Sequence, residues 1–404
     1  MKSNKEIVII GGGMVGLSIA YQLIERNISH NIVLIEKEKE LGMHSSGRNS
    51  GVIHAGLYYK PNTLKAKVCV KGGIRLKKWV GNNKLKINNC GKVIVPTNEK
   101  LDSQLDVLYE RGRKNGAVVE FIENSRLKEL VPETYSITNR ALWSPNTSVV
   151  NPKEVILTLK NELIGKGLKI YKNSKNWEVD PINNLIKISD GNLIRYDYLF
   201  NSAGLWADKI AHKFKVGKEY LLIPFKGNYW NVQENSKIKI KTNLYPVPDL
   251  NLPFLGVHFS PDSTNSKVSI GPTATLAFGR ENYELLDSIE PVNSFKNISL
   301  LAKQYFLNKF KFRQYVNNQA FLSFQPFLLN EAKKLVPNLK NSDIKISKKI
   351  GIRPQLFNIH KDKIEDDFIC LNAKDSTHII NAISPAFTSS FELGDLIIDN
   401  SKLI

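Results

Sequence analysis

The chain has 404 residues, of which 42% are hydrophobic and 24% charged, as expected for a globular protein with a large core and two domains. Its three cysteines, Cys69, Cys90 and Cys370, lie far apart and form no CxxC pair. This argues against a zinc site or a disulfide framework and fits a reducing compartment, so we expect no metal site. With no apolar run of about 18 residues and a first strand beginning by Glu6, we expect neither a transmembrane helix nor a signal peptide.

The formal net charge is +19. One explanation is an anionic partner, which could be nucleic acid, phospholipid or an acidic metabolite. The other is a lysine-rich composition spread over all surfaces. The lysines are scattered, without an arginine-rich tract or a block of five like charges, which favours the second explanation. We therefore expect no nucleic-acid partner.

The first 37 residues predict a βαβ unit. A short run rich in Ile and Val indicates a buried parallel strand over 6–10. Val15, Ile19 and Leu23 then recur at helical spacing, which predicts a helix from about 14 to 26. A second buried strand is expected over 31–37.

The rest of the chain alternates between helical and strand-like patterns. Helices are predicted over 60–80, 101–116, the segment that begins at Pro152, 295–335 and 389–398. Strands are predicted at 91–97, near 171, in a meander over 176–204, in many short pieces over 220–275, and at 367–373 and 377–383. Antiparallel segments thus interrupt the βα units, so we predict an α/β chain in which two domains interleave.

Residues 11–16, GGGMVG, fit the GxGxxG pattern. Glycines there let the backbone approach a pyrophosphate, and the following helix supplies amide donors. Glu36 ends the second strand twenty residues after Gly16, where a carboxylate would accept hydrogen bonds from a ribose. A tight turn without a ligand is the alternative, and the motif itself does not separate NAD from FAD.

The segment EKELGMHSSGRNSGVIHAGLYY follows this acid directly. Ser45, Ser46 and Gly47 would let the backbone return to the pyrophosphate, and Arg48 would answer its charge. His54 then arrives near the far end of a long dinucleotide. A loop histidine that hydrogen-bonds only locally is the alternative.

Five stretches, spread from one end of the chain to the other, carry a resemblance to a known family: SGRNSGVIHAGLYYKPNTLKAKVCVKG, LYPVPDLNLPFLGVHF, GPTATLAFGREN, GIRPQL and INAISPAFTSSFELG. Together they resemble the FAD-dependent family of D-amino-acid oxidase, sarcosine oxidase and glycerol-3-phosphate dehydrogenase. Within it, the stretches are most similar to the L-2-hydroxyglutarate dehydrogenases and oxidases. The resemblance implies a Rossmann-type FAD-binding domain (1–75, 146–215 and 345–404) interleaved with an antiparallel-sheet α+β substrate domain (76–145 and 216–344).

The resemblance also implies roles for individual residues. FAD contacts are expected from Gly11, Gly13, Met14, Val15, Gly16, Glu36, Lys37, Ser45, Ser46, Arg48, Asn49, Ser50, Ala203, Gly204, Pro385, Thr388 and Ser389. The last three begin the final helix, whose dipole would stabilise a reduced flavin, although simple helix capping explains them equally well. A covalent bond between His54 and the flavin, known in some relatives, stays open.

The expected catalytic residues are His54, His258 and Arg353. Arg353, in a GxRP segment, would bind the substrate carboxylate with two parallel donors, and a surface arginine is the alternative. His258 would face the substrate or be structural. Tyr58 is expected near the substrate. Lys226 and Arg280 would each meet a second carboxylate or be solvated charges.

The function implied is oxidation of L-2-hydroxyglutarate to 2-oxoglutarate, with hydride transfer from the alcohol carbon to FAD. Another 2-hydroxy acid, an N-methyl amino acid or glycerol 3-phosphate is the alternative substrate, and a basic flavoprotein acting on RNA is a remote alternative. The expected electron acceptor is a quinone or oxygen. We expect a bacterial, cytoplasmic protein, and a quinone acceptor would imply peripheral association with the inner face of the membrane.

Overall fold

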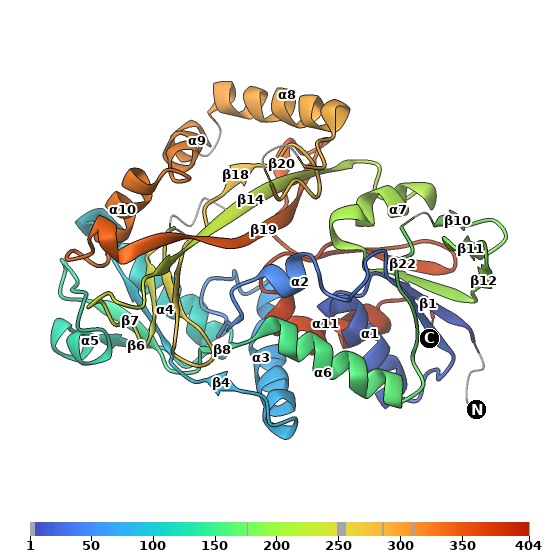
Figure 1. Cartoon of the computed structure of the whole chain (residues 1–404), viewed down its shortest axis with the longest axis horizontal. Coiled ribbons are helices and arrows are strands. Elements are labelled where there is room, and N and C mark those ends of the chain that lie inside the picture. Colours follow the sequence, from blue (N-terminus) through green and yellow to red (C-terminus); the bar gives the residue numbers. More distant parts are fainter. Residues whose placement is uncertain (1–4, 176, 249–255, 285–286, 309–311, 404) are drawn as a thin grey trace.

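A computed structural model describes residues 5–175, 177–248, 256–284, 287–308 and 312–403 (Figure 1). One half of it is built on a six-stranded sheet in the order β21-β22-β13-β1-β2-β9. All neighbours are parallel except β21 and β22. The strands are β1 (Ile7–Ile10), β2 (Ile32–Ile35), β9 (Lys169–Tyr171), β13 (Tyr198–Asn201), β21 (Ile369–Asn372) and β22 (Ser376–Asn381). The predicted βαβ unit is confirmed at the centre of this sheet.

Strand β1 is buried on both faces because its apolar run has no polar alternation. Ile7 and Ile9 face a core shared with four helices, and Val8 and Ile10 face a second core under the meander. The four helices are α1 (Met14–Glu25), α3 (Leu64–Asn82), α6 (Pro152–Gly165) and α11 (Ala386–Asp399). The meander is β10 (Glu178–Asp180), β11 (Leu185–Lys187) and β12 (Leu193–Arg195), beside α7 (Ala207–Lys213).

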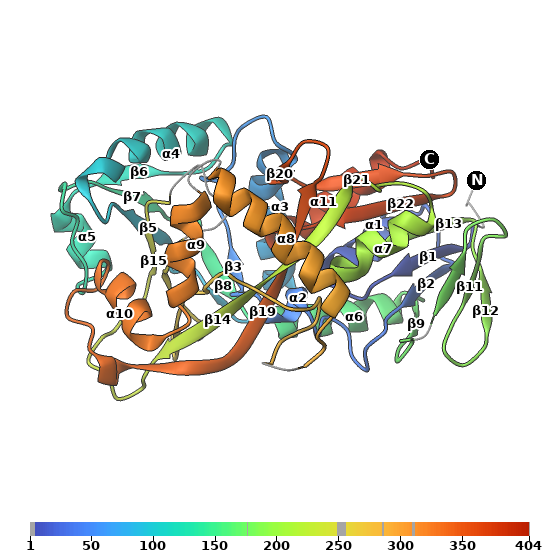
Figure 2. The same ribbon diagram turned by 90° about the horizontal axis from the view of Figure 1, so that it is seen from above.

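The other half is a ten-stranded mixed sheet, largely antiparallel. Its strands are β5 (Lys92–Val95), β6 (Glu120–Ile122), β7 (Ala141–Ser144), β14 (Tyr220–Val232), β15 (Asn243–Pro246), β16 (Phe259–Pro261), β17 (Val268–Ile270), β18 (Thr275–Leu276), β19 (Ile344–Asn358) and β20 (Lys363–Ile364). Helices α4 (Ser103–Lys114), α5 (Asn124–Leu130), α8 (Pro291–Leu307), α9 (Phe312–Phe321) and α10 (Gln325–Lys333) lie around it. Figures 1 and 2 show the long β14–β19 ribbon running alongside α8, α9 and α10, whereas α4 and α5 lie near β6 and β7 at the other edge of the sheet.

Two short elements connect the halves. The single-turn helix α2 (Ser45–Arg48) packs against β19 and α6. A small sheet joins β3 (Val52–Ile53), β8 (Ser148–Val150) and β4 (Ile87–Asn88). No helix in the described ranges is both long and apolar enough to cross a bilayer.

The sheets suggest a division slightly different from that expected from the sequence. The expected boundary at 345 falls inside β19, which pairs with β14 along its length and so belongs to the larger sheet. The expected boundary at 75 falls inside α3, which packs against α11 as one helix. We propose that the FAD-binding part begins again after residue 358 and includes all of α3.

A buried ion pair ties the two halves together. The Arg280 guanidinium donates to both carboxylate oxygens of Asp208 on α7, at 2.6 and 2.8 Å, and also to the Leu205 carbonyl. Arg280 is 5% exposed and Asp208 2%. Glu290 Oε2 lies 3.8 Å from Arg280 Nε. Removal of Asp208 would leave a desolvated guanidinium with only this distant carboxylate.

We therefore expect Asp208→Ala to lower the free energy of unfolding by about 3 kcal/mol, near the lower end of the range for a broken buried pair. Urea unfolding followed by fluorescence measures this. Asp106→Ala is the matched control, because Asp106 pairs with Arg140 at the surface, and it should cost about 1 kcal/mol or less. Equal losses in the two variants would contradict the structural role given to Asp208.

Candidate active site

A cavity of about 510 Å³ opens where β1, β2 and β13 end. Because parallel strands end at the same sheet edge, three segments far apart in sequence meet there. The cavity is lined by residues that include Gly11, Gly13, Glu36, Lys37, Ala203 and Gly204, all expected to contact a dinucleotide. The structure therefore brings these predicted residues together at one cavity.

The glycines at this edge are required by close backbone approaches. Gly11 has φ +103°, and a Cβ on it would lie 2.5 Å from the Ser202 carbonyl oxygen. A Cβ on Gly16 would lie 2.1 Å from the Gly11 carbonyl oxygen. Gly16 does not line either cavity. Its role is to hold the first turn of α1 against the loop, so it supports the site without facing it.

Glu36 is 8% exposed and accepts hydrogen bonds from two backbone amides. Its Oε2 accepts from Gly12 N at 2.8 Å, and its Oε1 accepts from Glu38 N at 2.9 Å. The carboxylate is thereby fixed at the end of β2, facing the smaller cavity. This is the position in which it could accept hydroxyl donors from a ribose.

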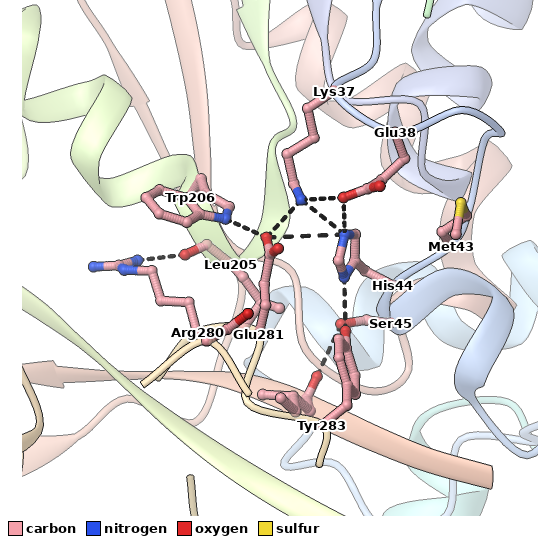
Figure 3. A network of polar contacts seen from close by, with 12 residues as sticks. Lys37, Glu38, Met43, His44, Ser45, Leu205, Trp206, Arg280, Glu281 and Tyr283 are labelled. Atoms are coloured by element: carbon pink, nitrogen blue, oxygen red, sulfur yellow. Dashed lines mark hydrogen bonds and ion pairs between the residues drawn. The ribbon is translucent and has the colours of Figure 1, made fainter. Parts of the chain in front are cut away.

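Beside Glu36, Lys37 belongs to a polar network that joins the halves (Figure 3). Its Nζ lies 2.5 Å from Glu38 Oε1, 2.6 Å from Glu281 Oε1 and 3.0 Å from His44 Nε2. Burial lowers the pKa of Lys37, but the two carboxylates raise it more, so its pKa lies above the ordinary value. Glu38, His44 and Glu281 have the spacing of metal ligands, but this ammonium already lies among them. Lys37 is thus the central cation of a polar network with Glu38, His44 and Glu281 beside the smaller cavity, which we call the Lys37 clasp.

The Ser- and Gly-rich loop forms α2, which lies between the two cavities. Ser46 Oγ accepts from Met14 N at 2.9 Å, and Ser45 Oγ donates to the Ile352 carbonyl. Asn49 Nδ2 donates to the carbonyls of Ser45 and Ser46. The loop is therefore held to both the glycine turn and β19.

Arg48 was expected to neutralise a pyrophosphate. Its guanidinium instead donates to the backbone carbonyls of Met43 and Ile350, and it lies 4.0 Å above the Tyr283 ring. Arg48 still lines the larger cavity, so its charge acts on that space while its hydrogen bonds hold the loop.

The larger cavity, about 650 Å³, is adjacent to the smaller one, and Ser45 and Ser46 line both. Its walls include these further residues predicted from the sequence: Met14, Val15, Asn49, Ser50, His54, Tyr58, His258, Arg353, Pro385 and Thr388. The first residues of α11 also line it, so this 14-residue helix directs its N-terminus at the cavity. A bound anionic group would be stabilised there by the helix dipole.

His54 is held on this wall by its backbone and by its ring. Its N–H donates to Thr388 Oγ1 at 3.1 Å, and its Nδ1 lies 3.5 Å from the ammonium nitrogen of Lys92. Burial and then the Lys92 charge hold the pKa of His54 well below its usual value. His54 is therefore neutral at neutral pH.

His258 lies on the same wall, stacked on Tyr245 with ring centroids 4.0 Å apart. Its Nδ1 donates to the Gly256 carbonyl at 2.8 Å, which leaves Nε2 as its acceptor nitrogen. Burial lowers the pKa of His258 to about 3. His258 is thus a fixed neutral hydrogen-bond acceptor and a weak base.

Lys92, which the sequence analysis missed, lies behind these rings at the start of β5. It is 0% exposed, and no described carboxylate forms an ion pair with it within 4 Å. Its ammonium lies 4.2 Å from the Tyr245 ring centre and 5.1 Å from that of Tyr58. Burial lowers the pKa of Lys92 to about 7. The sequence feature that could have identified Lys92 as buried is its position as the first residue of the apolar run KVIV.

The larger cavity is strongly cationic. Six basic side chains line it, against the two carboxylates of Asp362 and Asp366; the basic ones are Arg48, Lys60, Lys65, Arg111, Arg353 and Lys363. Arg353 is close enough to His258 and Tyr229 to shift the pKa of both. Lys65 and Arg111 were not expected from the sequence, because nothing in the helical pattern of their segments separates them from surface lysines and arginines.

Three predicted residues lie away from both cavities. Lys226 is adjacent on β14 to Gly227, which lines the larger cavity, so strand alternation turns its side chain away, and Nζ bonds to Asn282 and the Glu284 carbonyl. Arg280 is engaged by Asp208. Ser389 is fully buried, with its Cα 2.6 Å from where a Cβ on Gly72 would lie. None of these three residues lines either cavity, so the structure gives no support to the ligand contacts expected of them.

The residues fit FAD on structural grounds. The two adjacent cavities together form a path from a glycine-floored end, lined by both lysines and glutamates, to a cationic, aromatic end. Two helices, α1 and α11, direct their N-termini at this path. Such a path suits an elongated anionic dinucleotide.

Comparisons with known proteins agree with this fit. Residues 6–400 match the family model described as "FAD dependent oxidoreductase". The chain is 33% identical to the human mitochondrial L-2-hydroxyglutarate dehydrogenase over 98% of this chain and 88% of that protein. It is 34% identical to the L-2-hydroxyglutarate dehydrogenase of the bacterium Indibacter alkaliphilus, over 97% of each.

Solved structures show the same fold at lower identity. An L-α-glycerophosphate oxidase from Mycoplasma pneumoniae, with FAD bound, has a TM-score of 0.74 at 21% identity, covering 98% of this chain and 94% of the other. Glycine oxidase from Geobacillus kaustophilus has a TM-score of 0.71 at 16% identity, with 98% and 94% covered. With its glycine-floored cavity and nearly its whole length matched, the chain belongs to the FAD-dependent oxidoreductase family.

Proposed function

We propose that this protein oxidises L-2-hydroxyglutarate to 2-oxoglutarate. The observation that carries the proposal is the match, over 97–98% of the chain, to animal and bacterial proteins named L-2-hydroxyglutarate dehydrogenase. The cavity chemistry supports it, because six basic side chains suit a substrate with two carboxylates. Bound FAD supplies the hydride acceptor.

In this proposal Arg353 binds the carboxylate next to the reacting carbon. Strand β19 fixes its direction, because the residue before Pro354 is restricted to extended backbone. Lys65 and Arg111 replace Lys226 and Arg280 as ligands of the second carboxylate. Arg111 is already oriented by a hydrogen bond to the Tyr58 carbonyl at 3.1 Å.

The hydroxyl proton goes to His54, with Lys92 as the final acceptor. The O–H bond breaks as a bond to His54 Nε2 forms, and the Nδ1 proton moves to the neutral amine of Lys92. The hydrogen on the alcohol carbon leaves with its electron pair. The ammonium so formed lies over the faces of Tyr58 and Tyr245, which stabilise a cation. His258 accepts a hydrogen bond from the substrate without taking a proton.

The substrate is tested by anaerobic mixing with a panel of L- and D-2-hydroxyglutarate, lactate, sarcosine and glycerol 3-phosphate. L-2-hydroxyglutarate should bleach the flavin absorbance fastest, with 2-oxoglutarate formed in equal amount. Faster bleaching by sarcosine or glycerol 3-phosphate would assign the protein to another substrate class of the same family.

Arg353→Met should raise KM for L-2-hydroxyglutarate by about 10- to 100-fold, because a charged hydrogen-bonded pair is worth about 1.5–3 kcal/mol. Arg353→Lys should recover only part of this, since an ammonium lacks the two parallel donors. Steady-state kinetics measure both variants. Lys345→Met, which removes an exposed cation from the same strand, is the control. An unchanged KM in Arg353→Met would exclude this residue as the carboxylate ligand.

Lys92 gives a prediction on pH dependence. Only its neutral form accepts a proton, so flavin reduction should accelerate as pH rises through about 7, where burial places the pKa of Lys92, and then level off. Lys92→Met should slow reduction by about 100-fold, within the usual range for general-base catalysis, and remove this inflection. Rapid-mixing absorbance from pH 5.5 to 9 measures it.

Lys92→Arg separates proton acceptance from fixed charge. Its guanidinium stays protonated, so it should be as slow as Lys92→Met. Lys77→Met is the control for loss of a partly buried lysine. Lys77, on α3, donates to the Asn146 carbonyl and lines neither cavity. A Lys92→Arg variant with the normal rate and pH profile would contradict the proton-accepting role.

A further inference from the structure

Helices α8, α9 and α10, which we call the helical arch (residues 291–308 and 312–333), lie along the outer side of the β14–β19 ribbon (Figures 1 and 2). The arch has unusual exposure for the surface of a globular protein. Eight large apolar side chains on it are 44–74% exposed: Val292, Phe295, Ile298, Phe306, Leu307, Phe321, Phe324 and Phe327. Apolar exposure concentrated on three consecutive helices in this way indicates an interaction surface.

Helix α8 has part of its polarity reversed. Its buried side chains are Ser294, Asn297 and Gln304, whereas Phe295 and Phe306 are 73% and 74% exposed. A helix whose outer face contacted only water would place its phenylalanines inward and its amides outward. The outer face of α8 is therefore built to meet something apolar.

The charge of this segment identifies what it meets. Residues 291–333 contain six basic residues, one Glu and no Asp, and they hold seven of the 18 phenylalanines of the chain. Basic residues therefore outnumber acidic ones on the arch, although Lys303 forms an ion pair with Asp362 at 3.2 Å. Aromatic rings interleaved with an excess of cations match a bilayer interface with anionic headgroups, where rings enter the acyl boundary and lysines meet phosphate.

The arch also lies at the mouth of the larger cavity. Gln304, on the inner side of α8, lines that cavity and donates to Asp362 Oδ1 at 2.8 Å. The exposed Lys60, Lys363 and Asp366 line the same cavity and so mark its opening. A surface that holds α8 would therefore lie beside the entrance to the site.

We propose that the helical arch docks on the surface of an anionic phospholipid bilayer. Lipid binding does not depend on the substrate assignment. If that assignment holds, docking brings the cavity entrance next to a lipid-soluble oxidant of the quinone class, which would reoxidise the flavin.

Sedimentation of the flavin-loaded protein with vesicles tests this. Vesicles of phosphatidylcholine with about one third phosphatidylglycerol should bind the protein, and binding should weaken in 0.5 M salt, because screening acts on surface charges. The double variant Phe295→Ser/Phe306→Ser should bind at least about 10-fold more weakly even at low salt, since it loses two exposed rings that docking would bury in the bilayer. Lys296→Gln should reduce the salt-sensitive part.

The matched control is Ile182→Ser/Leu193→Ser. These side chains are 90% and 65% exposed in the meander, so the variant removes exposed apolar area elsewhere and should bind vesicles normally. Flavin content and sedimentation without lipid report the fold and the oligomeric state of each variant.

Three outcomes would overturn the proposal. The first is a wild-type protein that stays in the supernatant with anionic vesicles. The second is equal vesicle binding by the arch variant and the meander control. The third is a stable dimer that the arch variant converts to a monomer, with no vesicle binding by either, which would assign the arch to self-association. None of these outcomes bears on the substrate, which the anaerobic panel tests separately.

Discussion

The site depends on how closely two strand ends approach each other. The Ser202 carbonyl after β13 lies where a side chain on Gly11 would begin, 2.5 Å from that Cβ position. Gly16 is excluded from bearing a side chain by Gly11 itself. This contact sets the height of α1 above the sheet edge, and with it the place where the amides of its first turn point. Glu36 and α2 are then positioned by hydrogen bonds to this same turn, so that one steric constraint organises the whole dinucleotide end.

The second half contributes the β14–β19 ribbon as a wall of the site, whereas the first half contributes the glycine turn. Strands β14 and β19 are paired from Tyr220 with Asn358 to Val232 with Ile344, and a ribbon of this length crosses from one half to the other. Ser45 of α2 donates to the Ile352 carbonyl in the middle of it. The loop that holds the cofactor path is therefore also bonded to the strand that carries Arg353. A shift of either half would change the distance between His54 and Arg353, and the Lys37 clasp opposes such a shift from the other side.

The fold was largely predictable because its signals are local. The strand over 6–10, the glycine turn and the acid at Glu36 are read from one short segment, and the structure has them as expected. Charged residues were predicted less well, because their role depends on partners distant in sequence. Arg280 has the residue type of a carboxylate ligand, but its carboxylate is Asp208, 72 residues away. Lys92 has the residue type of a surface charge, but β7 and β15 flank it in the sheet and bury it.

The buried cations of this chain differ in whether an acid is paired with them, and this difference distinguishes a structural role from a chemical one. Arg280 is paired with Asp208, and Lys37 is shared between two carboxylates, so both have their desolvation offset by hydrogen bonds to acids. Lys92 is more deeply buried than either and has aromatic faces and an imidazole in place of an acid. An amine in that setting gives up its proton readily, which would be a poor way to stabilise a sheet. It is a good way to keep a base beside His54, as the proposed proton transfer from a substrate hydroxyl requires.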